Sequence, residues 1–137
     1  MAKGEVNQFD LFLTIQKSWM RETSADSENW SSEHPAWGQC AVTALTVQDF
    51  LGGELIRLDL AGHNDSKIAS MRSHYFNRII GGAELDISSS QFGDINRFYQ
   101  FRFSQEVSIR DRSYLMGNLD TVARYTRLRY EVARVLG

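Results

Sequence analysis

Apolar residues recur at helical spacing in three segments of the chain, residues 6–21, 38–51 and 118–136. The first segment predicts a helix that ends near Met20. The second is apolar on nearly every side, which is typical of a helix buried at the centre of a domain, and Gly52-Gly53 should end it. The third predicts a C-terminal helix capped by Asn118 or Asp120.

Between the second and third helices the pattern changes to a period of two. Such alternation predicts strands over residues 54–60, 73–80, 83–87 and 97–103. Residues 22–36 are rich in serine and acidic side chains and indicate a surface loop, and residues 61–70 indicate another. Two helices, then mainly antiparallel strands, then a helix define an α+β domain, in which a buried N-terminal helix packs on the sheet.

Gly81-Gly82 predicts a hairpin, and the length of its loop decides where Asp86 points. With a two-residue loop, Asp86 falls opposite Asn77 and faces away from His74. With a three-residue loop, Ile79 pairs with Ala83, and Asp86 lies diagonal to His74 on the same face, within roughly 5–8 Å. Glycine permits the second arrangement because it adopts positive φ at little cost. The pattern leaves both registers open.

The bulk properties describe a single soluble domain over residues 1–137. Apolar residues make up 42% and charged residues 23% of the chain, the net charge is −2, and the one cysteine leaves no internal disulfide. Neither a secretory signal peptide nor an apolar run of membrane-spanning length is recognisable, so we expect a cytoplasmic protein without a membrane partner. The near-neutral charge gives no indication of nucleic acid binding.

The single cysteine lies in the stretch WGQCAVTAL, at the predicted start of the buried helix. A cysteine attacks as its thiolate, and the positive end of a helix and a nearby histidine both lower its pKa. Cys40 is therefore the candidate nucleophile, His74 the candidate acid–base and Asp86 the residue that orients the histidine. Gly38 allows a sharp turn before the thiol.

Each of these residues also has a structural interpretation. A cysteine at a helix start is often a small buried hydrophobe, a strand histidine is often a satisfied core residue, and Asp86 could cap a turn at Ser88–Ser90. A metal site built from Cys40, His63, His74 and Asp86 lacks paired ligand spacing, so no metal or cofactor is expected. The arginines of the last helix fit a solvated face better than a phosphate or nucleic-acid site; they are Arg124, Arg127, Arg129 and Arg134.

Three blocks in order, WGQCAVTA, HYFN and GGAELDISSSQ, resemble the nucleophile, histidine and aspartate segments of the transglutaminase-like (papain-like) superfamily. The combination SHYFN…GG…ELDIS…QF is also similar to small, largely uncharacterised bacterial proteins called YunG-like. The superfamily resemblance implies a papain/transglutaminase-like core and a Cys40–His74–Asp86 triad, with Gln39 near the oxyanion and Trp37 and Gly38 beside the substrate. Ala41 departs from the aromatic residue that often follows the family's cysteine. The family's oxyanion tryptophan has three candidates, Trp19, Trp30 and Trp37.

These features predict a cysteine-dependent hydrolase or acyltransferase that acts on an amide or ester carbonyl of a peptide, a small amide or a protein. The alternative is a binding module that keeps the fold without chemistry and recognises a protein or peptide. The acidic loop at residues 22–36 and the basic C-terminal segment at residues 97–137 would be its binding surfaces. The substrate, the acceptor and the oligomeric state are not determined by the sequence.

Overall fold

The computed structural model describes residues 7–92 and 107–136. The helical elements are α1 (Gln8–Ser18), η1 (Arg21–Thr23), α2 (Cys40–Leu51), α3 (Ser66–Ala69), η2 (Ser89–Phe92), α5 (Arg112–Met116) and α6 (Leu119–Leu136). The strands are β1 (Glu54–Asp59), β2 (Ser73–Arg78), β3 (Glu84–Leu85) and β4 (Val107–Arg110). No helix within these residues is long and apolar enough to cross a membrane.

The strands form one antiparallel sheet in the order β3-β2-β1-β4. In β1 and β2, Leu58 lies opposite His74 and Arg57 lies opposite Tyr75. Because side chains alternate along a strand, His74 and Tyr75 face opposite sides of the sheet. Tyr75 is on the side that packs against α2.

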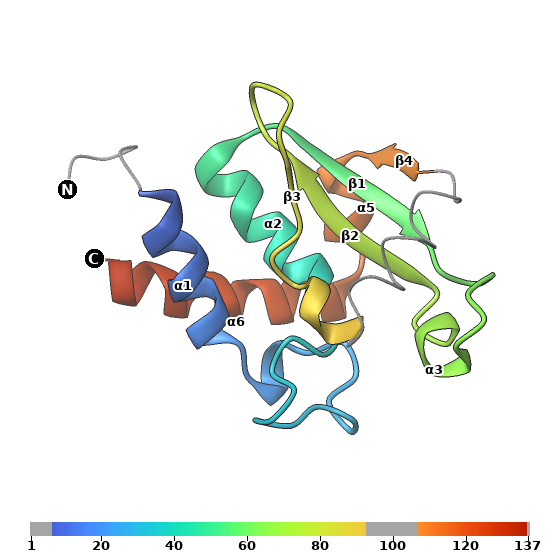
Figure 1. Ribbon diagram of the computed structural model, residues 1–137. Coiled ribbons are helices and arrows are strands. Elements are labelled where there is room, and N and C mark those ends of the chain that lie inside the picture. The colour runs from blue at the N-terminus through green and yellow to red at the C-terminus, as the bar shows by residue number, and fades with distance from the viewer. Residues whose placement is uncertain (1–6, 93–106, 137) are drawn as a thin grey trace.

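Helix α2 lies between the sheet and the helices α1 and α6, as Figure 1 shows. It contacts β1 and β2 on one side and α6 on the other, and α1 packs against α6. Two clusters of buried residues account for this placement: Val42 and Val47 pack with α1 and α6, whereas Ala44 and Leu45 pack with the sheet. A helix that is apolar on both sides is held between two layers by hydrophobic burial.

The three predicted helices and the α+β class are confirmed, with ends shifted by a few residues. Strands 54–60, 73–80 and 83–87 are also present, the last shortened to two residues. The strand expected over 97–103 lies outside the described residues. The loop expected at 61–70 instead contains α3, because the Asp65 carboxylate caps its first amides. Strand β4 and helix α5 were not anticipated.

Candidate active site

Cys40 is the first residue of α2, so its sulfur lies at the positive end of the helix dipole. The preceding Gly38 has φ +74°, and its carbonyl accepts a hydrogen bond from the Ala25 amide. A Cβ at this position would lie 2.3 Å from the Ser24 Oγ and 2.9 Å from the Ala25 nitrogen. Only glycine fits both this dihedral and this close contact, as the sequence predicted for the turn before the thiol.

The hairpin between β2 and β3 has the three-residue loop. The Ile79 amide donates to the Ala83 carbonyl at 2.9 Å, and Asn77 lies opposite Leu85. Gly81 and Gly82 have φ values of +100° and +97°, so both glycines provide the conformation that the loop requires. Of the two registers that the sequence leaves open, this one places Asp86 on the same face as His74.

The Asp86 carboxylate binds the His74 ring. Nε2 of His74 lies 2.8 Å from each Asp86 oxygen, and since a carboxylate only accepts, Nε2 is the donor. The His74 side chain is fully buried and that of Asp86 is 13% exposed. A buried charged hydrogen bond fixes the ring's orientation, and Nδ1 is the ring nitrogen that does not bind Asp86.

The pKa of Cys40 is lowered and that of His74 is raised, and both shifts favour an ion pair between them. Burial by itself raises the pKa of the Cys40 thiol, but the hydrogen bond and charge of His74, with a further bond from the Tyr75 backbone N–H, lower it overall. Burial opposes the protonated form of His74, yet the Asp86 charge and the hydrogen bonds from Asp86 and Cys40 raise the pKa of His74 to about 9. A lowered thiol pKa and a raised imidazole pKa favour the thiolate form of Cys40 and the imidazolium form of His74.

Gln39 has a different position from the one expected near an oxyanion. Its side chain is fully buried, its Oε1 accepts from the Thr23 hydroxyl at 2.7 Å, and its Nε2 donates to the Met20 carbonyl at 3.0 Å. The amide therefore joins α2 to η1 and is not among the described residues that line the cavity beside Cys40. Its partners lie 16 and 19 residues away in the sequence, so the local motif gave no indication of them.

The three tryptophans use their indole N–H groups in the scaffold. Trp19 donates to the Thr43 hydroxyl, Trp30 to the Pro35 carbonyl, and Trp37 to the Asp26 carboxylate. Trp37 is the one beside the candidate site, because Asp26 and the adjacent Gly38 both line the cavity. Its ring also lies under the Lys67 ammonium, 4.7 Å from the ring centroid.

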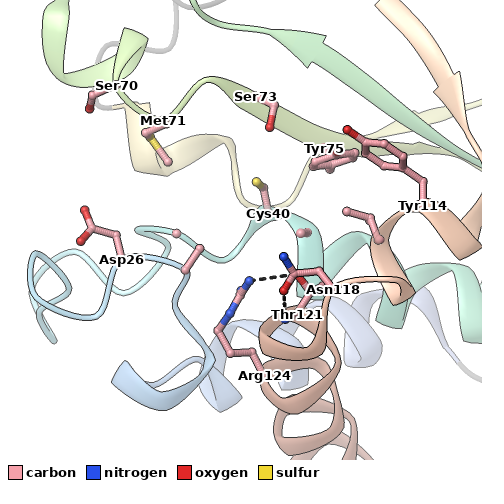
Figure 2. A pocket seen from close by; sticks show the side chains of 14 residues that line it. Asp26, Cys40, Ser70, Met71, Ser73, Tyr75, Tyr114, Asn118, Thr121 and Arg124 are labelled. Atoms are coloured by element: carbon pink, nitrogen blue, oxygen red, sulfur yellow. Dashed lines mark hydrogen bonds between the residues drawn. The ribbon is translucent and has the colours of Figure 1, made fainter.

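A cavity of about 560 Å³ opens beside the sulfur. Figure 2 shows Cys40 between Ser73 and Tyr75 of the sheet and Asn118 and Arg124 of the C-terminal region. Tyr114 and Asp26 complete its polar wall. The sequence did not indicate Tyr75 and Tyr114 at one end of the cavity, or Asn118 and Arg124 at the other, as site residues, because they come together only in the tertiary fold.

The remaining candidates are structural. Within residues 7–92 and 107–136, no group of three metal-ligating side chains is assembled. The Asn77 amide donates to the Ala44 carbonyl and ties β2 to α2. The arginines of α6 largely form ion pairs: Arg124 with Asp120, Arg129 with Asp49 and Arg134 with Glu131.

Comparison with known proteins identifies the family. The profile of the YunG protein family matches residues 7–137. The chain belongs to the YunG family. It is 30% identical over 97 residues to the uncharacterised protein YunG of Bacillus subtilis (strain 168). The aligned segment covers 71% of this chain and 73% of that protein. A comparison of this chain with solved structures found no match.

Proposed function

We propose that this YunG-family protein is a cysteine-dependent hydrolase or acyltransferase with a core related to the transglutaminase-like superfamily. The observation that supports it is the relay from Asp86 to His74 to Cys40, in which the carboxylate holds the imidazole at 2.8 Å and the imidazole lowers the pKa of the thiol against the effect of burial. Carboxylate, imidazole and thiol in this order form the arrangement that activates a cysteine nucleophile.

In the acylation step, the Cys40 thiolate attacks the carbonyl carbon of an amide or ester. A carbon–sulfur bond forms, and the carbonyl π pair moves to oxygen. The first backbone amides of α2 lack carbonyl partners within the helix and stabilise that oxyanion. Collapse of the intermediate breaks the bond to the leaving group, which takes the Nδ1 proton of His74 and departs as an amine or alcohol.

In the second step, water or an amine attacks the thioester carbonyl. Neutral His74 accepts the proton of the attacking group, the carbon–sulfur bond breaks, and the thiolate–imidazolium pair is restored. His74 keeps its Nε2 proton throughout and donates it in the hydrogen bond to Asp86, whose carboxylate stabilises the imidazolium charge. The buried position of His74 supports this role, since a low-dielectric surrounding strengthens the pair.

The test is the acyl-enzyme itself. The protein is incubated with p-nitrophenyl acetate, quenched in acid and digested, and the peptide that carries Cys40 is examined by mass spectrometry. We expect acetylation of Cys40 that decays with time and decays faster when an amine is added. Cys40→Ala should abolish labelling, and His74→Gln should slow it by at least a hundredfold.

Absence of an acyl adduct in a folded wild-type protein that also fails to accept stronger acylating esters would contradict the proposal. The non-catalytic module would then be favoured. In that case a Cys40→Ala protein with unchanged melting temperature would retain the biological phenotype of the wild type.

A further inference from the structure

Arg57 departs from the packing pattern of its strand. It lies on the central strand β1, on the same face as Leu55, which is fully buried against Ala44 and Leu45 of α2. Alternation predicts another apolar side chain at position 57. A half-buried arginine in that place breaks a local rule of sheet packing, and such departures are expected where a protein binds a ligand.

Arg57 and Arg110 also differ from the other half-buried arginines in their ion pairs. Carboxylates pair with the half-buried arginines Arg78, Arg112, Arg124 and Arg129. Within the part of the chain that the structure describes, no carboxylate pairs with Arg57 or Arg110. The Nε atom of each is buried without a hydrogen-bond partner in these residues. An uncompensated charge that is partly removed from water is costly, and an anion would offset that cost.

The two arginines are neighbours on one face of the sheet. Arg57 lies opposite Ser108 of β4, and Arg110 is two residues further along β4 on the same face. Such diagonal positions are separated by about 7–8 Å, a distance that allows two guanidinium groups to bind one anionic group.

Two tyrosines connect this pair to the cavity. Arg57 lies directly opposite Tyr75 on the neighbouring strand, and the guanidinium carbon of Arg110 lies 5.1 Å from the centroid of the Tyr114 ring. Tyr75 and Tyr114 both line the cavity beside Cys40, and Figure 2 shows them together at one end of it. Tyr75 packs in the same buried cluster as Cys40 and is the cross-strand neighbour of Arg57, at roughly 5 Å between their Cα atoms.

We propose that Arg57 and Arg110 form an anion subsite and that the substrate acylating Cys40 carries a carboxylate which binds there. This inference rests on the proposed function, because it names the substrate class of that site. A carboxylate is favoured over a phosphate because Asp26 lies on the same cavity and disfavours additional negative charge. The substrate class is thus an amide or ester bearing a carboxylate within a few bonds of the scissile carbonyl.

The experiment uses iodoacetamide-type reagents that differ only in their distal group. N-iodoacetyl derivatives of glycine, β-alanine and 4-aminobutyric acid are compared with their primary amides and with an aminomethylphosphonate analogue. The second-order rate constant for alkylation of Cys40 in the full chain is measured for each. We expect a carboxylate reagent of one spacer length to react about tenfold or more faster than its amide, with saturation, and faster than the phosphonate.

Arg57→Gln and Arg110→Gln should each reduce that preference to near unity, and Arg57→Lys should restore part of it. The matched control is Arg127→Gln, which removes the same charge from an exposed position of α6 and should leave the preference unchanged. Melting temperatures verify that each variant is folded.

Equal rates for acids and amides at all spacer lengths would overturn the inference, as would an equal loss in Arg127→Gln. A preference for the phosphonate over every carboxylate would assign the subsite to phosphate and overturn the carboxylate assignment. These outcomes are independent of the proposed function, because the activation of Cys40 is judged from its rates with the neutral amides alone.

Discussion

His74 and Asp86 face each other across a hairpin, with the ring Nε2 2.8 Å from both carboxylate oxygens. The contact exists because the loop contains three residues, which makes Asp86 the diagonal neighbour of His74. A loop one residue shorter would direct the carboxylate to the other side of the sheet. The candidate chemistry therefore depends on the backbone freedom of two glycines, Gly81 and Gly82.

The buried His74 makes stability depend on pH in a way that Cys40 masks. The pKa of His74 is raised from 6.5 to about 9, so its contribution to stability is complete below about pH 6.5 and is lost as pH rises toward 9. The pKa of Cys40 is lowered in the folded state, so its contribution grows as pH rises. Where the folded thiol is ionised and the pH lies between about 6.5 and 8.5, each state binds one proton, the folded state on His74 and the unfolded state on Cys40, so the two effects cancel.

Cys40→Ala should remove this cancellation. We expect its free energy of unfolding to fall as pH rises above about 6.5, because Asp86 alone still raises the pKa of His74. Urea unfolding at several pH values measures the slope. Adding Asp86→Asn to the alanine variant should abolish the decline; a decline that persists in the double variant would show that Asp86 does not stabilise the imidazolium.

Gly38→Ala should destabilise the protein by about 2 kcal/mol or more, since φ is +74° and the new Cβ would approach the Ser24 Oγ to 2.3 Å. The matched control is Gly62→Ala, because nothing lies within 4 Å of a Cβ there. Its stability should change by less than about 1 kcal/mol. Thermal unfolding of both variants tests the difference, and equal melting temperatures would contradict the assigned turn.

Arg57→Met should leave the free energy of unfolding unchanged or raise it. A half-buried cation without a carboxylate partner in the described residues is replaced by an apolar side chain that extends the buried surface of Leu55. Chemical denaturation provides the measurement. A loss of more than about 2 kcal/mol would indicate that Arg57 is kept for the fold, through its packing beside Tyr75, and not for a ligand.

The periodicity of the chain was enough to predict the helices, three of the strands and the α+β class. It also reduced the position of Asp86 to a choice between two hairpin registers, but the register depends on glycine φ values that the sequence permits without requiring. The local motif assigns Gln39 to the site because it precedes Cys40, whereas in the structure its side-chain amide hydrogen-bonds Thr23 and Met20. Sequence neighbours do not determine the direction of a buried polar side chain, because its partners come from the tertiary fold.

The residues on the far wall of the cavity could also not be predicted from the sequence. Tyr114, Asn118 and Arg124 line the cavity beside Cys40 only because Leu115 of α5 packs against α2 and because α6 contacts α2. Neither the period of α6 nor its charge distinguishes these residues from an ordinary solvated face. Arg57 offered one signal, a cation at an inward position of a strand, although its significance depends on the absence of a carboxylate nearby in the described structure.

The most direct test of the Cys40–His74–Asp86 relay is the pH dependence of Cys40 alkylation by iodoacetamide in the folded protein. We predict a rate constant that stays high well below the ordinary thiol pKa of about 8.5, and a shift of this profile to higher pH in Asp86→Asn and His74→Gln. A wild-type profile that rises only near pH 8.5 and does not change in either variant would contradict the account.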